Sequence, residues 1–290
     1  MELVLSTILL RPYVFTFLGC FLFISIVNFG LRTTVLFTLF TYGVALGCEW
    51  SSVHNGFPFG LYHYVEATRG RELWVLGVPF MDSLSFTFLS FASYTVALLL
   101  CAPLCRYGRQ LRLLDTVCIR RSARVCLLAA LFMVMVDLVV DPLSVRGDRW
   151  FLGRLFWYDP PGPFFGVPIS NFVGWYLVAA LSVALFQALD ARLGRMRSKP
   201  LGVVAGMPFG CLLGPGLYLG IVGFGVVMLF RIGAVEIAWT AIFIYLPFIA
   251  LAAHILSRPA SYGDNTAVEL HLADFPYDRP FCAPPEGRAG

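Results

Sequence analysis

Residues 123–141 read ARVCLLAALFMVMVDLVVD, a run in which a single arginine near the start precedes only apolar residues up to Asp137. A helix of about 20 such residues crosses the hydrocarbon core of a bilayer. Six more apolar stretches of similar length occur along the chain, at about residues 12–31, 33–50, 78–103, 167–189, 203–230 and 232–256. The hydropathy pattern therefore predicts a helical membrane protein with about seven spans.

The composition of the whole chain supports the same fold class. Of the 290 residues, 59% are apolar and 13% are charged, and the mean hydropathy is +0.79. A water-facing surface needs about 25–35% charged residues, so a soluble globular domain is excluded. We expect an all-α polytopic transmembrane helix bundle over residues 1–256, followed by a polar, proline-rich tail over residues 257–290 that is poorly ordered.

Arginine-rich loops indicate how the bundle is oriented. Loops 104–122 and 190–202 hold most of the basic residues between spans, and such loops stay on the cytoplasmic side. The long loops 51–77 and 142–166 then face the opposite side, although Arg11 and Arg231 fit this orientation less well. The net charge of +4 is accounted for by topology, so we expect a membrane environment and no nucleic-acid partner.

The two long loops resemble each other in sequence. Each ends in the triplet Gly-Val-Pro, at residues 77–79 and 166–168, and a polar residue follows three positions after each proline, Asp82 in one case and Asn171 in the other. Each loop also follows a span that ends in acids. The repetition indicates a duplicated helix–loop–helix unit. The alternative is that Gly-Val-Pro is a common way to begin a helix.

Carboxyl groups inside the spans are the main functional candidates. An ionised carboxylate at the bilayer centre costs about 2.5–3.5 kcal/mol on the insertion scale, so such residues usually serve a function. With the predicted orientation, all of them and Asn171 lie toward the outer ends of their spans. The five acids are Glu49, Asp82, Asp137, Asp141 and Glu236.

Asp137 and Asp141 form the most informative pair. Residues four apart on a helix share a face, with Cβ atoms about 5–6 Å apart, and two carboxyls that close in a dry site cannot both ionise cheaply. One should keep its proton, which places an acid beside a base as general acid–base catalysis requires. Alternatively, Asp141 caps the helix before Pro142.

Two other acids differ in how easily a structural role explains them. Glu49 has no local partner that would neutralise it. Asp82 could instead interact favourably with the dipole at the N-terminus of its helix.

Aromatic residues are abundant, with 27 Phe, 12 Tyr and 6 Trp, and many fall in the two outer loops. An interfacial aromatic belt explains part of them. The remainder could form a cage that stabilises a positive charge, or could stack on a polyene. The rings expected to line such a pocket are Phe59, Tyr62, Trp157 and Tyr158. No metal-ligand spacing, phosphate-binding loop or dinucleotide fingerprint is present, so we expect no metal and no cofactor.

Two segments resemble the motifs of an integral-membrane carotenoid biosynthesis family. Residues 157–175 read WYDPPGPFFGVPISNFVGW, and residues 57–64 read FPFGLYHY ahead of the first Gly-Val-Pro. Asp137 and Asp141 lie where that family carries acids. The resemblance covers roughly residues 35–190, and the characterised members of the family are carotenoid 1,2-hydratases acting on γ-carotene or bisanhydrobacterioruberin-like ends.

The resemblance implies that water adds across the terminal C1=C2 bond of an acyclic carotenoid ψ-end group, giving a tertiary alcohol without a cofactor. For that reaction, the protonated member of the Asp137/Asp141 pair would be the acid and Glu49 would position the water. Asp82 and Asn171 would complete the hydrogen bonds. The implied partners are a carotenoid in the bilayer and other carotenoid-pathway enzymes. The implied location is the cytoplasmic membrane of a bacterium or archaeon.

Other functions remain open at this stage. A membrane prenyltransferase binds diphosphate through Mg²⁺ and Asp-rich motifs, and Asp137-x-x-x-Asp141 resembles one half of such a motif, but the second half is absent. A proton-coupled transporter also uses intramembrane acids, although its acids should form a path across the whole membrane. A pigment-binding or scaffold protein is the non-catalytic alternative.

Overall fold

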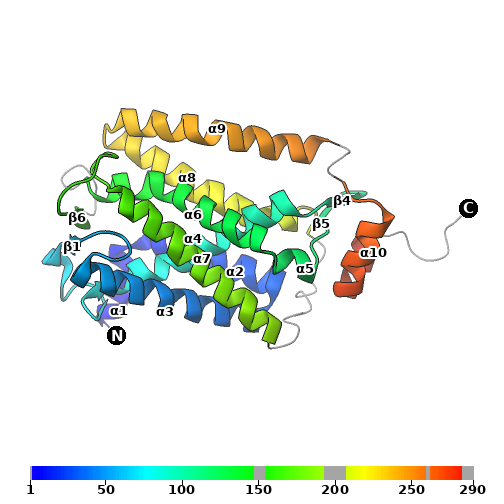
Figure 1. Ribbon diagram of the computed structural model, residues 1–290, viewed down its shortest axis with the longest axis horizontal. Helices are drawn as coiled ribbons and strands as arrows, with labels where there is room; N and C mark the ends of the chain where they lie inside the picture. The colour runs from blue at the N-terminus through cyan, green and yellow to red at the C-terminus, as the bar shows by residue number, and fades with distance from the viewer. Residues whose placement is uncertain (1, 147–153, 193–206, 259–261, 283–290) are drawn as a thin grey trace, which may run out of the picture.

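The computed structural model describes residues 2–146, 154–192, 207–258 and 262–282, and it is an all-α bundle (Figure 1). In this part of the chain, seven helices are long and apolar enough to cross a membrane, which confirms the predicted number of spans. They are α2 (Pro12–Phe29), α3 (Leu31–Asn55), α4 (Phe80–Cys101), α6 (Ala123–Ser144), α7 (Ile169–Arg192), α8 (Leu213–Arg231) and α9 (Val235–Ser257). A short helix, α1 (Glu2–Leu10), precedes the first span.

The central helix of the bundle is α4. Within its most apolar window, 78% of the residues are buried, against 22–56% in the other six spans. The outward faces of the surrounding helices carry large exposed apolar side chains, including Leu39, Leu131, Leu181, Val227 and Phe243. These side chains suit a lipid environment because a helix satisfies its own backbone hydrogen bonds and only needs apolar side chains outside.

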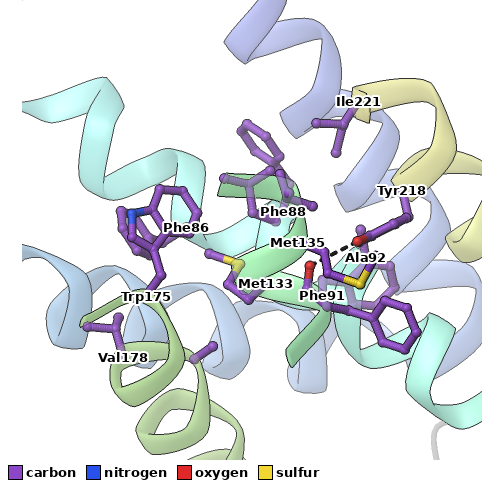
Figure 2. Close-up of a cluster of buried hydrophobic side chains, with 14 of the residues drawn as sticks. Phe86, Phe88, Phe91, Ala92, Met133, Met135, Trp175, Val178, Tyr218 and Ile221 are labelled. Atoms are coloured by element: carbon purple, nitrogen blue, oxygen red, sulfur yellow. Dashed lines mark hydrogen bonds between the residues drawn. The ribbon is translucent and has the colours of Figure 1, made fainter. Parts of the chain in front are cut away.

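A single large core joins the seven spans. Figure 2 shows part of it, where Phe86 of α4 and Trp175 of α7 lie side by side with ring centroids 4.6 Å apart. Tyr218 of α8 donates a hydrogen bond to the Phe132 carbonyl at 2.9 Å. That carbonyl belongs to α6, so within the core ring packing joins α4 to α7 and a polar contact joins α8 to α6.

The sixth span begins later than the sequence suggests. The triplet Gly214-Pro215-Gly216 would interrupt a helix over 203–230, but α8 starts at Leu213, after the short 3₁₀ helix η2 (Gly210–Leu212). The proline therefore lies in the first turn, where its missing N–H costs little. Residues 203–206 lie outside the described part of the chain.

Short strands from the two long loops pair with each other at one end of the bundle (Figure 1). Strand β1 (Tyr62–Tyr64) runs antiparallel to β6 (Phe156–Tyr158), so that Tyr62 lies opposite Tyr158. The first loop also contains η1 (Glu66–Thr68). It ends in a small hairpin of β2 (Trp74–Val75) and β3 (Val78–Pro79).

The backbone repeats where the two loops enter α4 and α7. Leu76 and Gly77 have φ values of 54° and 81°, and Phe165 and Gly166 have φ values of 51° and 96°. A non-glycine residue with positive φ is uncommon, so its occurrence just before both Gly-Val-Pro triplets shows that the two loops turn in the same way. This agrees with the duplicated helix–loop–helix unit inferred from the sequence.

The opposite end of the bundle carries a second group of small elements (Figure 1). It contains a hairpin of β4 (Leu104–Tyr107) and β5 (Gln110–Leu113), then α5 (Val117–Arg120). The C-terminal segment forms α10 (Asn265–Asp274), η4 (Pro276–Asp278) and α11 (Arg279–Cys282). The tail that we expected to be poorly ordered is thus helical over much of its described length, because it packs buried side chains such as His271 and Cys282.

Candidate active site

A cavity lies at the end of the bundle where β1 and β6 pair. It holds about 920 Å³ of unfilled space, including its opening. Its walls come from α2, α3, α4, α6, α7 and α8 and from both long loops. The polar residues among them are Tyr13, Glu49, Tyr62, Tyr64, Asp82, Ser85, Asp141, Ser144, Tyr158 and Asn171.

Asn171 connects the two aspartates of α6. Its Nδ2 donates to Asp137 Oδ2 at 2.6 Å and to Asp141 Oδ2 at 2.7 Å. The Tyr158 hydroxyl donates to the same Asp141 oxygen at 2.8 Å, and the two carboxyl groups lie within electrostatic range of each other. The structure therefore brings the predicted acid pair together with Asn171 and Tyr158 in one buried network.

The two aspartates occupy different positions relative to the cavity. Asp141 lines the wall, whereas Asp137 is fully buried behind it and is absent from the lining. Within the described residues, Asp137 Oδ1 has no hydrogen-bond partner. Asp141 also does not cap the helix, because α6 continues through Pro142 to Ser144. Asp141 is therefore the aspartate of this pair that can touch a molecule in the cavity.

Glu49 and Asp82 face the cavity from α3 and α4. The Ser83 hydroxyl donates a hydrogen bond to Glu49, and Glu49 lies within electrostatic range of both Asp82 and Asp141. On the loop side, the Tyr62 and Tyr64 hydroxyls are 3.3 Å apart, and Tyr64 lines the cavity together with Asp82. Three carboxyl groups thus share one cavity.

The fifth acid does not join this group. Glu236 is exposed in the first turn of α9 and does not line the cavity. Among the described residues, no group of three or more His, Cys, Asp or Glu side chains is placed to hold a metal ion.

The loop tyrosines are hydrogen-bond donors at neutral pH. Burial raises the pKa of Tyr62, Tyr64 and Tyr158 above the ordinary value of 10, because removing a phenolate from water is costly. Each hydroxyl therefore keeps its proton and can hold a carboxylate oxygen or a water molecule in place.

Aromatic rings form most of the remaining wall near the carboxyl groups. Phe59, Tyr62 and Tyr158 line the cavity as expected, and the Tyr62 and Tyr158 ring centroids are 5.8 Å apart. Trp157 does not line it: its exposure is 39%, and its ring packs against His63. The expectation for Trp157 was wrong because successive side chains of a strand point to opposite faces.

A glycine lets the first loop reach the cavity wall. At Gly174 of α7, an added Cβ would lie 2.5 Å from Phe59 Cδ1 and 2.9 Å from the Pro58 carbonyl oxygen. Only a residue without a side chain allows the loop to pack this closely on the helix. The close contact holds Phe59 against the bundle, with an exposure of 3%.

A buried ion pair beside the cavity was missed from the sequence. Arg11, between α1 and α2, donates from Nε and Nη2 to the two carboxylate oxygens of Glu72, at 3.0 and 2.9 Å. The two side chains are 3% and 0% exposed. Because they are 61 positions apart in the sequence, no local signal predicts the pairing.

Comparison with known proteins identifies the family. A model of the family described as carotenoid biosynthesis protein matches residues 3–247. The chain belongs to this family. Its general role is therefore carotenoid biosynthesis, and the resemblance noted in the two loop motifs is confirmed. No solved structure gives a significant match.

One characterised relative of this carotenoid biosynthesis protein has a named activity. The bisanhydrobacterioruberin hydratase of Haloarcula japonica is 34% identical over 167 residues, which cover 56% of this chain and 46% of that protein. The matched part thus spans about half the length of the relative.

Proposed function

We propose that this protein is a membrane enzyme that hydrates the terminal C1=C2 double bond of an acyclic carotenoid ψ-end group. The observation that carries the proposal is the position of Asp141. It lies on the wall of a buried, ring-lined cavity and is joined through Asn171 to a second carboxyl, that of Asp137. The name of the Haloarcula relative supports the same reaction class.

The first step transfers a proton from the Asp137/Asp141 pair to C2 of the alkene. Asp141 is the member that touches the substrate, and Asp137 is a positioning residue that shares the hydrogen-bond network behind it. As the proton leaves, a carboxylate forms. The hydrogen bonds from Tyr158 and Asn171 to Asp141 Oδ2 are already in place to stabilise that charge, as preorganised donors do in other active sites.

The second step adds water to the tertiary cation at C1. The π-faces of Phe59, Tyr62 and Tyr158 stabilise the positive charge, and Glu49 or Asp82 orients the water and accepts its proton. The alkene gains one hydrogen at C2 and one hydroxyl at C1. One carboxyl loses the proton that another gains, and that proton returns to the Asp137/Asp141 pair before the next turnover. The net reaction consumes one water and requires no cofactor.

The rest of the cavity suits a hydrocarbon chain. Away from the carboxyl groups, its lining is apolar and comes from α2, α4 and α8, with Phe17, Phe88, Leu89, Ile221 and Phe224. A polyene bound along these side chains would keep its end group among the carboxyls. The structure thus supports a carotenoid end as substrate more directly than a diphosphate.

The test is pigment analysis after expression in a host that makes lycopene or γ-carotene. We expect a product heavier than the substrate by one water, identified by mass and retention time. A product extended by an isoprenoid unit, or a loss of activity on adding a metal chelator, would instead favour a prenyltransferase.

Asp141→Asn tests the residue assignment in the same host. We expect the variant to insert and fold but to form no hydrated carotenoid, because the amide cannot deliver the proton. Glu236→Gln is the matched control, since it makes the same kind of change at an exposed acid outside the cavity. Full hydration by Asp141→Asn would remove this carboxyl from the mechanism.

A further inference from the structure

A second, more polar cavity adjoins the first on the loop side. It holds about 490 Å³ of unfilled space, including its opening, far more than the roughly 30 Å³ that one water occupies in the liquid. The loop residues Ala67 and Thr68, which are exposed and half-buried, respectively, form part of its wall. Tyr64 and Asp82 line both cavities, so these two side chains stand at the junction.

Buried charged groups in the wall of this second cavity indicate that it holds water. Arg11 and Glu72 both line it and form the ion pair described above. Arg11 is 2% exposed, and within the described residues its Nη1 has no hydrogen-bond partner. A buried N–H group is normally hydrogen-bonded to protein or to ordered water. The cavity is polar and roomy enough for water to supply that partner.

We propose that this second cavity is the path by which water reaches the active site, and that Asp82 and Tyr64 pass it to the reacting carbon; the proposal rests on the hydratase function. Each turnover consumes one water, yet a bound polyene would fill the main cavity and exclude water from it. A separate entrance removes this conflict.

The geometry also assigns Asp82 a direct part in the second step. Tyr64 and Asp82 line both cavities, and Asp82 lies within electrostatic range of Glu49, which lines the main cavity. A water that Asp82 holds at the junction is supplied from the second cavity and faces the cation in the main cavity. It forms the C1–O bond as its proton passes to the Asp82 carboxylate.

Ala67→Trp tests this path, because it places a large side chain in the wall of the second cavity at an exposed position. Thr68→Leu narrows the same cavity at a half-buried position and serves as a second variant. Leu61→Trp is the control, since Leu61 is an exposed residue of the same loop that lines neither cavity.

The reaction is followed in D₂O with membranes that contain the full chain and the carotenoid. A cation that water does not capture loses a proton from C2 and returns as the alkene, with deuterium at C2. We measure the hydrated product and the deuterium in the recovered substrate by mass spectrometry. In both variants we expect the hydrated product to fall several-fold while the ratio of deuterium exchange to hydration rises, and Leu61→Trp should match the wild type.

Two results would overturn the water path. One is wild-type hydration in both variants, and the other is an equal fall in hydration and exchange, which would indicate general damage to the site. If the wild-type protein itself makes no hydrated carotenoid, the proposed function fails, and this outcome is distinct from a failure of the path.

Discussion

Asp137 and Asp141 are the same residue type one helical turn apart, yet they have different surroundings. Asp141 meets the cavity and accepts hydrogen bonds from Tyr158 and Asn171. Asp137 is buried behind it, with one oxygen bonded to Asn171 and the other without a partner among the described residues. Asp141 is therefore the carboxyl that can react with a bound molecule, and Asp137 is the carboxyl that lies behind it in the same hydrogen-bond network.

Tyr158→Phe should slow hydration without preventing it. The change removes one hydrogen bond to the carboxylate that forms at Asp141. A hydrogen bond to a charged group contributes about 1.5–3 kcal/mol, so we expect the rate to fall about ten- to a hundredfold. The rate is measured from the accumulation of the hydrated carotenoid.

Tyr218→Phe is the control for this variant. Tyr218 is another buried tyrosine with a hydrogen-bonded hydroxyl, but it does not line the cavity. We expect some loss of stability and little change in rate. An equal loss of rate in both variants would show that Tyr158 acts only through stability.

At the scale of elements, the site depends on loops that are held by helices. β1 and β6 come from different loops and pair at the mouth of the cavity, which turns Tyr62 and Tyr158 toward each other. The first loop also packs closely against α7 at Gly174, and this contact holds the loop that carries β1 against the bundle.

Gly174→Ala should destabilise the protein and displace Phe59. The new Cβ would meet the Phe59 ring and the Pro58 backbone, and overpacking of this kind costs about 1–3 kcal/mol. We expect a lower unfolding temperature in detergent. Gly220→Ala in α8 is the control, because nothing lies within 4 Å of its Cβ position. A stable Gly174→Ala variant would contradict the packing argument.

The C-terminal segment should detach more easily as the pH rises. Burial lowers the pKa of His271, but its hydrogen bond to Asp278 and the charge of Asp115 outweigh this and raise the pKa above 6.5. The protonated ring therefore stabilises docking below about pH 6.5, and that stabilisation is lost as the pH rises through the folded pKa.

Hydrogen exchange of residues 265–282 between about pH 6 and pH 9 measures this effect once it is corrected for intrinsic exchange rates. We expect protection to fall with rising pH in the wild type. In His271→Gln the pH dependence should disappear, and its persistence would assign the effect to another group.

At the scale of the whole molecule, the two ends of the bundle differ in chemistry. One end holds the carboxyl-lined cavity and the paired aromatic strands, and the other holds the arginine-rich hairpin with α5 and α10 (Figure 1). The arginines of the loop 104–122 lead us to propose that this second end faces the cytoplasm. Substrate chemistry would then take place near the outer leaflet.

Thiol labelling tests this orientation. Cys118 is exposed at the arginine-rich end, so in a variant that keeps only this cysteine we expect an impermeant reagent to label inside-out vesicles alone. Leu61→Cys, in a chain without other cysteines, should be labelled only in right-side-out vesicles. The reverse pattern would invert the proposed topology.

The local pattern of residues was sufficient to predict the membrane spans and to select the candidate acids. A bilayer requires about 20 apolar residues per helix, so hydropathy alone predicted the seven spans, although the sixth begins later than expected, at Leu213. The high cost of a buried charge likewise marked Glu49, Asp82, Asp137 and Asp141, and their positions in the spans predicted that they would meet at one end.

The directions of side chains and the pairing of distant residues were decided only by the tertiary structure. The register of β1 and β6 decides that Tyr158 points inward and Trp157 outward, and the packing of α6 decides that Asp141 and not Asp137 lines the cavity. The pairing of Arg11 with Glu72 likewise joins residues 61 positions apart. Hydropathy is a property of each segment, whereas these contacts depend on how distant segments meet in space.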